Sequence, residues 1–197
     1  MSGLTAFVLA GGKSSRMGAD KAFLKFEGRT LLERALALAR ALTGEVRIVG
    51  PREKFAAFGA VVEDVYADRG PLAGIHAALR SSSAELNLML PVDMPRLKEA
   101  FLRHLLAVAR ASDAVVTVPR LASGWQPLCA VYRRPFADVA EAALEAGKNK
   151  VDALFTGVST RVIEEDELRQ FAFDAVMFQN LNTPEDWEQA ENGPPRP

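Results

Sequence analysis

An apolar run that stops at two adjacent glycines constrains this chain more than any other feature. Residues 4–10 form the run, Gly11-Gly12 follow it, and three basic residues come next at Lys13, Arg16 and Lys21. This order predicts a buried strand that ends in a sharp turn, because glycine adopts backbone conformations that side chains exclude. Backbone amides at such a turn can face an anion, and basic side chains can bind several phosphate oxygens. The segment is therefore predicted to be a nucleotide-binding loop.

The spacing of the glycines excludes two other phosphate-binding loops. A Walker loop requires Gly-x-x-x-x-Gly-Lys-Ser/Thr and a dinucleotide fingerprint requires Gly-x-Gly-x-x-Gly, whereas here the next glycine after the adjacent pair is Gly18. An ordinary glycine turn before an exposed basic stretch would explain the two glycines alone. The presence of Arg16, Gly18 and Lys21 at these spacings favours the nucleotide-binding interpretation.

Composition narrows the class of protein. The chain has 197 residues, of which 49% are hydrophobic and 25% charged, and this suits one α/β domain with a substantial core. The net charge of -1 argues against a protein that binds nucleic acid or a membrane surface. Cys129 is the only cysteine, which excludes an internal disulfide and a cysteine-based zinc site. Because neither a signal peptide nor an apolar stretch of about 20 residues is found, we expect a cytoplasmic protein without a membrane span.

Strand-like runs alternate with helical patterns along the chain, which predicts parallel strands joined by right-handed crossovers. Strands are expected over residues 4–10, 45–49, 60–65, 86–92, 114–118, 126–132, 161–164 and 176–179. Helices are expected over residues 31–42, 71–80, 97–111, 135–145 and 184–190. Thr30 and Glu33 predict a capping box at the first helix, and the strand over 126–132 is the one expected to differ in sense. We expect a single domain over residues 1–192 and a disordered tail over 193–197.

The loop resembles the G-G-x-x-x-R-M-G-x-D-K signature of nucleotidyltransferases, which pass a nucleoside monophosphate from a nucleoside triphosphate (NTP) to an acceptor. Within that superfamily the chain most resembles the molybdenum cofactor guanylyltransferases, the molybdopterin-guanine dinucleotide biosynthesis protein A family. Four further segments carry the resemblance in the family's order: Gly70–Gly74, Pro91–Pro95, Gln126–Ala130 and Asn180–Glu185. The resemblance covers nearly the whole chain. It implies an α/β, Rossmann-like nucleotidyltransferase fold, with three layers (αβα) and a mostly parallel central sheet.

The resemblance also implies a reaction. GMP would pass from GTP to molybdenum-molybdopterin, with Mg²⁺ as the cofactor, to give molybdopterin guanine dinucleotide and pyrophosphate. Transient contact with molybdoenzymes or their chaperones would follow. No catalytic base is evident, and this fits an acceptor that is a phosphate monoester, because its second pKa near 6 leaves it largely ionised at neutral pH.

Asp93 is the first candidate for catalysis. It directly follows the predicted strand over 86–92, and ligands of open α/β sheets collect at the carboxyl ends of the strands. Magnesium at such sites is typically held by one or two carboxylates and by substrate phosphates. A turn-capping role would explain the position equally well. The resemblance implies that Asp93 is the metal ligand, with Arg16 and Lys21 neutralising charge on the phosphates and the Gly11-Gly12 amides holding them.

The remaining site residues are implied by the resemblance alone. The residues expected to bind GTP are Leu9, Ala10, Gly11, Gly12, Arg16, Lys21, Asp68 and Asp93, and those expected to bind molybdopterin are Gly74, Asn180 and Asn182. Asp68 could instead be a turn residue neutralised by Arg69. Gly74 could serve helix–sheet packing, and the two asparagines could belong to the cap of the last helix.

Rival interpretations share the loop but differ in substrate or activity. Some family members carry Asn on the second strand, which this chain lacks over residues 47–51. A cytidylyltransferase acting on molybdopterin, or another NTP transferase of the same fold, is the nearest alternative. Those cytidylyltransferases tend to show Gly-Asp where this chain has Pro91-x-Asp93, which favours guanylyl transfer. A non-catalytic nucleotide sensor and a scaffold for cofactor delivery belong to a different class.

Overall fold

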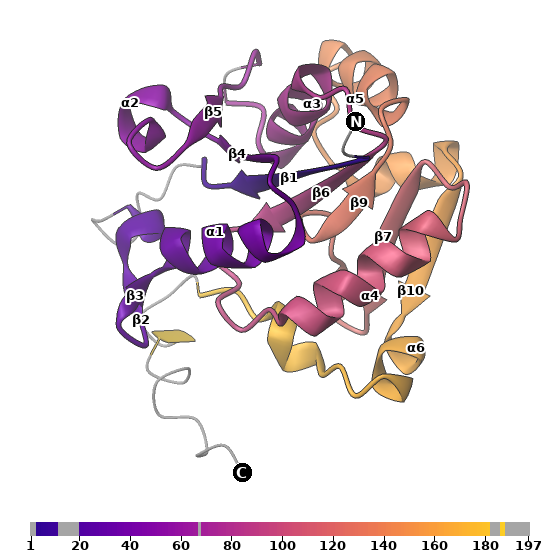
Figure 1. Ribbon diagram of the computed structural model, residues 1–197. Coiled ribbons are helices and arrows are strands. Elements are labelled where there is room, and N and C mark those ends of the chain that lie inside the picture. Colours follow the sequence, from indigo (N-terminus) through magenta and orange to yellow (C-terminus); the bar gives the residue numbers. More distant parts are fainter. Residues whose placement is uncertain (1–2, 12–19, 67, 182–185, 188–197) are drawn as a thin grey trace.

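Two layers of helices enclose an eight-stranded sheet in the computed structural model, which describes residues 3–11, 20–66, 68–181 and 186–187 of the chain (Figure 1). Helices α1 (Leu31–Leu42) and α4 (Glu99–Arg110) cover one face of the sheet, and α3 (Pro71–Ser81) and α5 (Phe136–Glu145) cover the other. Each face has its own buried apolar cluster, because the strands present alternate side chains to opposite sides. Phe7 faces α3 and α5, for example, while Ala6 and Val8 face α1. The predicted three-layer α/β fold is confirmed.

The strand order of the sheet is β10-β7-β9-β6-β1-β4-β5, with β8 paired to β7. The bounds are β1 Leu4–Leu9, β4 Val46–Val49, β5 Ala60–Val62, β6 Leu86–Pro91, β7 Val116–Leu121, β8 Gly124–Trp125, β9 Ala130–Tyr132 and β10 Thr160–Glu164. Strand β9 is antiparallel to both β6 and β7, as is β8 to β7, and the other pairs are parallel. Six parallel strands therefore end at one edge, here called the carboxyl edge: Leu9, Val49, Val62, Pro91, Leu121 and Glu164. Their first residues form the opposite, amino edge.

The capping box predicted for α1 is present in both directions. The Glu33 amide donates to Thr30 Oγ1 at 3.2 Å, and the Thr30 amide donates to Glu33 Oε2 at 2.8 Å. The helices α2 (Arg52–Phe55) and α6 (Glu165–Gln170) are additional to the predicted elements, and so are the 3₁₀ segments η1 (Lys21–Phe23) and η2 (Asp152–Gly157). A short hairpin of β2 (Lys25–Phe26) and β3 (Arg29–Thr30) leads into α1.

Two strand predictions need correction. Residues 176–179 form no strand, because the Asp174 carboxylate caps the Val176 amide at 3.0 Å and starts the 3₁₀ segment η3 (Ala175–Phe178), which buries Phe178 against Phe101. The strand predicted over 126–132 is confined to β9, because the Cys129 amide donates to the Gln126 carbonyl at 3.0 Å and closes a turn. The strand predicted over 60–65 ends at Val62, and the one predicted over 114–118 runs instead from Val116 to Leu121.

The tail predicted over 193–197 lies outside the described residues, and so does most of the closing helix predicted over 184–190. Residues 186 and 187 of that helix are described, and both are helical. Cys129 is fully buried, as predicted, and burial raises the pKa of its thiol. Among the described residues, no helix combines the length and apolar character that crossing a membrane requires.

Candidate active site

The end of β1 is tied to β4 at the carboxyl edge. The amides of Ala10 and Gly11 both donate to the Val49 carbonyl at 3.0 Å, and a Cβ on Gly11 would lie 3.4 Å from the Gly50 Cα. Glycine at position 11 therefore permits two backbones to approach closely. The Gly11 amide already donates within the sheet, and its predicted contact with a phosphate stays a prediction. Gly12 and Arg16 lie outside the described residues.

Lys21 and Asp93 meet at this edge although 71 residues lie between them in the sequence. Lys21 opens η1, Asp93 follows β6, and Lys21 Nζ lies 3.9 Å from Asp93 Oδ2. Their side chains are 18% and 24% exposed, so both are mostly withdrawn from water yet open to a ligand. The central position of β6 beside β1 brings the two predicted catalytic residues together.

Burial sets the protonation behaviour of Asp93. Loss of hydration raises the pKa of the carboxyl group, while the Lys21 ammonium and the Asp93 backbone amide lower it in part. Any further positive charge that binds beside Asp93 would favour the ionised form of its carboxyl group. The site is therefore chemically suited to a cation that accompanies an anionic substrate.

Asn180 is brought to the same edge by a backbone contact. The Leu181 amide donates to the Asp93 carbonyl at 3.0 Å, which fixes the segment after η3 beside the end of β6. Within the described part of the chain, the Asn180 Oδ1 atom is buried and accepts no hydrogen bond. A buried amide oxygen without a donor is costly, so a donor from a bound molecule would stabilise it. Asn182 lies outside the described residues.

Gly74 is explained by packing. A Cβ there would lie 3.3 Å from Val49 Cγ1 and 4.0 Å from Leu9 Cδ2, so glycine lets α3 approach the ends of β4 and β1. Asp68 stands exposed in the turn before α3, with a positive φ of 58°. This matches the turn position that the sequence suggested.

Asp64 is a candidate site residue that the sequence did not reveal. It follows β5 by two residues, and its Oδ1 atom lies 3.6 Å from the place of a Cβ on Gly74. Burial raises the pKa of its carboxyl group. Ligands of open α/β sheets collect at the carboxyl ends of the strands. This rule could have pointed to Asp64, because two acidic residues, Glu63 and Asp64, directly follow β5.

The described part of the chain offers few side chains that could hold a metal ion together. Within residues 3–11, 20–66, 68–181 and 186–187, no three His, Cys, Asp or Glu side chains gather around one point. A hard cation that keeps waters and takes phosphate oxygens needs only one or two carboxylates from the protein. Asp93 fits such a cation and would not by itself build a structural metal site.

Comparisons with known proteins agree with the fold. Residues 6–161 match the model of the MobA-like NTP transferase domain. The chain is 34% identical over 195 residues to the molybdenum cofactor guanylyltransferase of Desulfosudis oleivorans, covering 97% of this chain and 96% of that protein. It is 33% identical over 187 residues to the enzyme of that name from Syntrophotalea carbinolica, covering 94% and 89%.

A solved structure agrees as well. The crystal structure of molybdopterin-guanine dinucleotide biosynthesis protein A from Archaeoglobus fulgidus superposes with a TM-score of 0.83 at 28% identity, covering 95% of this chain and 96% of that one. Fold and site together define a nucleotidyltransferase. The chain belongs to the MobA-like NTP transferase family.

Proposed function

We propose that this protein transfers GMP from GTP to molybdenum-molybdopterin and so forms molybdopterin guanine dinucleotide and pyrophosphate. The similarity to guanylyltransferases over nearly the full length of both chains supports the substrates. The observation that carries the reaction type is the meeting of Lys21 and Asp93, 3.9 Å apart, at the carboxyl edge. A cation beside a carboxylate suits a site that receives a polyanion together with a metal ion.

In the proposed reaction, the terminal phosphate of molybdopterin attacks the α-phosphorus of GTP. A bond forms between an acceptor oxygen and that phosphorus, and the bond from the phosphorus to the bridging oxygen of the pyrophosphate breaks. The acceptor oxygen is already ionised near neutral pH, so the protein need not remove a proton. Lys21 holds phosphate oxygens, Asp64 faces the nucleotide from the end of β5, and Asn180 accepts a hydrogen bond from the acceptor.

Magnesium is the proposed cofactor, and Asp93 is the residue that would hold it. When bound, such an ion supplies positive charge to phosphate oxygens whose negative charge grows during transfer. Arg16 and Gly12 remain in the proposal on the family resemblance, as do Leu9, Ala10 and Asp68 for GTP and Asn182 for the acceptor. Gly11 for GTP and Gly74 for molybdopterin also remain on the family resemblance. Packing of α3 against the ends of β4 and β1 is a second reason for glycine at position 74.

The test is product formation from purified protein, molybdenum-molybdopterin and magnesium, with each of GTP, CTP, ATP and UTP in turn. The proposal predicts that GTP gives the dinucleotide and one pyrophosphate per product, at a rate well above the other three nucleotides. Preference for CTP would make the protein a cytidylyltransferase. Binding of GTP without pyrophosphate release would make it a nucleotide sensor.

A further inference from the structure

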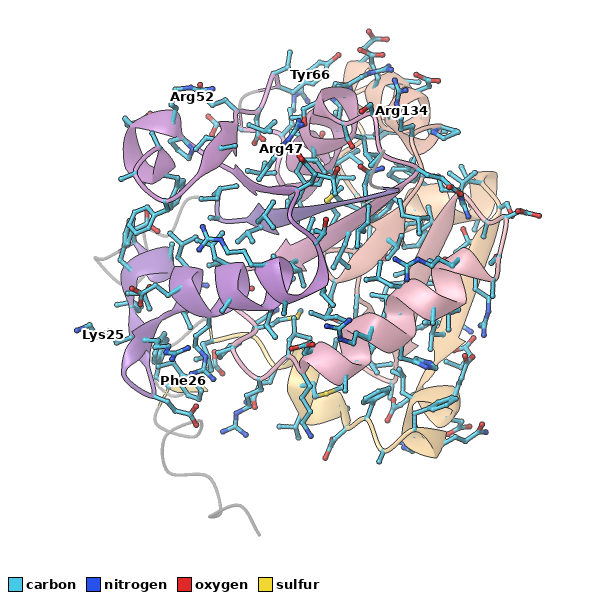
Figure 2. All side chains as sticks on the ribbon, in the orientation of Figure 1. Lys25, Phe26, Arg47, Arg52, Tyr66 and Arg134 are labelled. Carbon is cyan, nitrogen blue, oxygen red and sulfur yellow. The ribbon has the colours of Figure 1, made fainter. Side chains whose placement is uncertain are left out.

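Helix α2 is anchored by hydrogen bonds at both of its ends and by one buried aromatic ring. The Arg52 amide donates to Glu63 Oε1 at 3.1 Å, and its guanidinium reaches the Val61 carbonyl at 3.3 Å, so the start of α2 is tied to β5 and the residue after it (Figure 2). Phe55 is fully buried, and a Cβ on Gly50 would lie 2.8 Å from its ring. The chain after α2 is tied to α1, because Arg40 donates to the Phe58 carbonyl at 2.9 Å. Helix α2 is therefore anchored both to β5 and to the end of α1, and it can serve as a support for residues that pack against it.

The residues on both sides of Lys21 attach to this support. Lys54 of α2 lies with Nζ 2.8 Å from Asp20 Oδ2, directly before Lys21. The other Asp20 oxygen caps η1 by accepting from the Ala22 amide at 3.2 Å. Two residues after Lys21, the ring of Phe23 stacks on the ring of Phe55, with centroids 5.8 Å apart. The backbone that carries Lys21 is thus fixed before and after it.

The Lys54–Asp20 ion pair also neutralises the negative charge next to Lys21. An unpaired carboxylate directly beside Lys21 would compete with phosphate for the Lys21 ammonium and would repel a triphosphate. Lys54 neutralises that charge from the side of α2 and leaves Lys21 directed toward Asp93, which lies 3.9 Å from it.

We propose that Asp20 and Lys54 are positioning residues that hold Lys21 in the orientation in which it binds the triphosphate. The inference rests on the proposed function, since it assigns Lys21 to GTP. The Lys54 and Asp20 side chains are 46% and 21% exposed, and exposed ion pairs contribute little to folding stability. The pair should therefore matter for GTP turnover and leave the melting temperature nearly unchanged.

The test is a set of mutant cycles in which kcat and KM for GTP are measured with molybdopterin and magnesium at fixed concentrations. We expect Lys54→Met to lower kcat/KM about two- to fivefold, Lys54→Arg to restore it, and Asp20→Asn, which keeps an oxygen for the cap, to match Lys54→Met. The double variant should be no worse than either single one. The control Arg103→Met removes an exposed ion pair with Glu99 on α4 and should leave kcat/KM unchanged.

The same Lys54→Met change is then made in a Lys21→Ala background, with single-turnover product formation to follow slow reactions. If Lys54 acts through Lys21, it has no further effect there. An equal fold-change in both backgrounds would mean that Lys54 contacts the substrate itself, and no effect of Lys54→Met on the wild type would mean that the pair positions nothing. Either result overturns the inference. Failure of the wild type to use GTP would instead count against the proposed function.

Discussion

The two edges of the sheet use charged side chains in opposite ways. At the amino edge, the Arg133 guanidinium donates to the carbonyls of Ala109 and Ser112 at 3.2 and 2.8 Å and to that of Ala114 at 3.2 Å, and it pairs with Glu85. Every one of these partners is fixed in the protein, so the arginine joins the end of α4 to the start of β7. Charge at this edge stabilises the fold.

At the carboxyl edge one buried polar atom has no partner among the described residues. The closest atoms of Lys21 and Asp93 are 3.9 Å apart, and the Asn180 Oδ1 atom accepts nothing from the described residues. Burial also raises the pKa of the Asp93 carboxyl group. We infer that a buried acceptor without a donor, such as Asn180 Oδ1, and a carboxyl group whose pKa is raised by burial, such as that of Asp93, indicate a ligand site, whereas Arg133 with its internal partners does not.

The largest expected effect is on Asp93. Asp93→Asn keeps the size of the side chain and removes its charge, so we expect kcat to fall about 10²- to 10³-fold. The melting temperature should stay the same or rise, because burial disfavours the ionised carboxylate in the folded protein. Steady-state turnover of GTP and calorimetry on the same preparation check both parts. Near-normal turnover would show that Asp93 holds no metal.

Lys21 comes next. Lys21→Ala removes a cation from the phosphates, and hydrogen bonds to charged groups typically contribute about 1.5–3 kcal/mol. We expect GTP affinity or kcat/KM to fall about ten- to a hundredfold with little change in stability of the unliganded protein. Isothermal titration with GTP decides it. A variant that is largely unfolded but binds GTP normally in its folded fraction would make Lys21 a structural residue.

Arg133 should give the reverse pattern. Arg133→Met leaves three carbonyls without their donor, so we expect a loss of about 2–3 kcal/mol in the free energy of unfolding and a fall of several degrees in melting temperature. The kcat/KM for GTP should not change. The neighbouring exposed Arg134 provides the matched control, since Arg134→Met should alter neither quantity (Figure 2). Loss of turnover by Arg133→Met without loss of stability would break the comparison.

Local patterns predicted the fold well where a single segment decides its own structure. The capping box at Thr30 predicted the start of α1, and the near-continuous apolar run before Asp93 predicted β6. Residues 176–179 were predicted wrongly because their apolar side chains fit a strand or a helical turn equally, and the Asp174 cap decided the outcome. Short elements such as α2 were missed because four residues carry no measurable periodicity.

The candidate site was predictable in its residue types and not in its arrangement. The end of β6 at Asp93 and the basic loop with Lys21 pointed to the carboxyl edge, where the structure places both residues. Their proximity depends on β6 lying beside β1, a long-range pairing that no local pattern contains. The bonding of the Gly11 amide to Val49 and the position of Asp64 depend on β4 and β5 in the same way.

Asn180 offers a smaller effect at the carboxyl edge. Asn180→Ala removes one hydrogen-bond acceptor, so we expect affinity for molybdopterin to fall about three- to tenfold while GTP affinity stays the same. Titration of each ligand separately distinguishes the two. Unchanged molybdopterin affinity, or a loss confined to GTP, would return Asn180 to a purely structural role.

The smallest effect concerns His76, which lies in α3 away from both edges. Burial lowers the pKa of its imidazole, with Arg80 acting in the same direction and Glu141 opposing it. The unfolded chain therefore takes up the proton more readily, so stability is complete above the ordinary histidine pKa near 6.5 and declines as the pH falls through that value. The melting temperature of the wild type should fall as the pH is lowered from about 7.5 to about 5.5, roughly one unit to either side of the ordinary histidine pKa. We expect His76→Gln to make this pH dependence weaker. An unchanged pH profile would contradict this.

The most direct test of the difference between the edges is the shift in melting temperature that GTP and magnesium produce in three proteins. We expect a positive shift in the wild type and the same shift from a lower starting temperature in Arg133→Met. Asp93→Asn should start at an unaltered or higher temperature and lose the magnesium-dependent part of the shift. If Asp93→Asn lowered the starting temperature and kept the full shift, the carboxyl edge would serve the fold and not the ligand, and the central claim would be wrong.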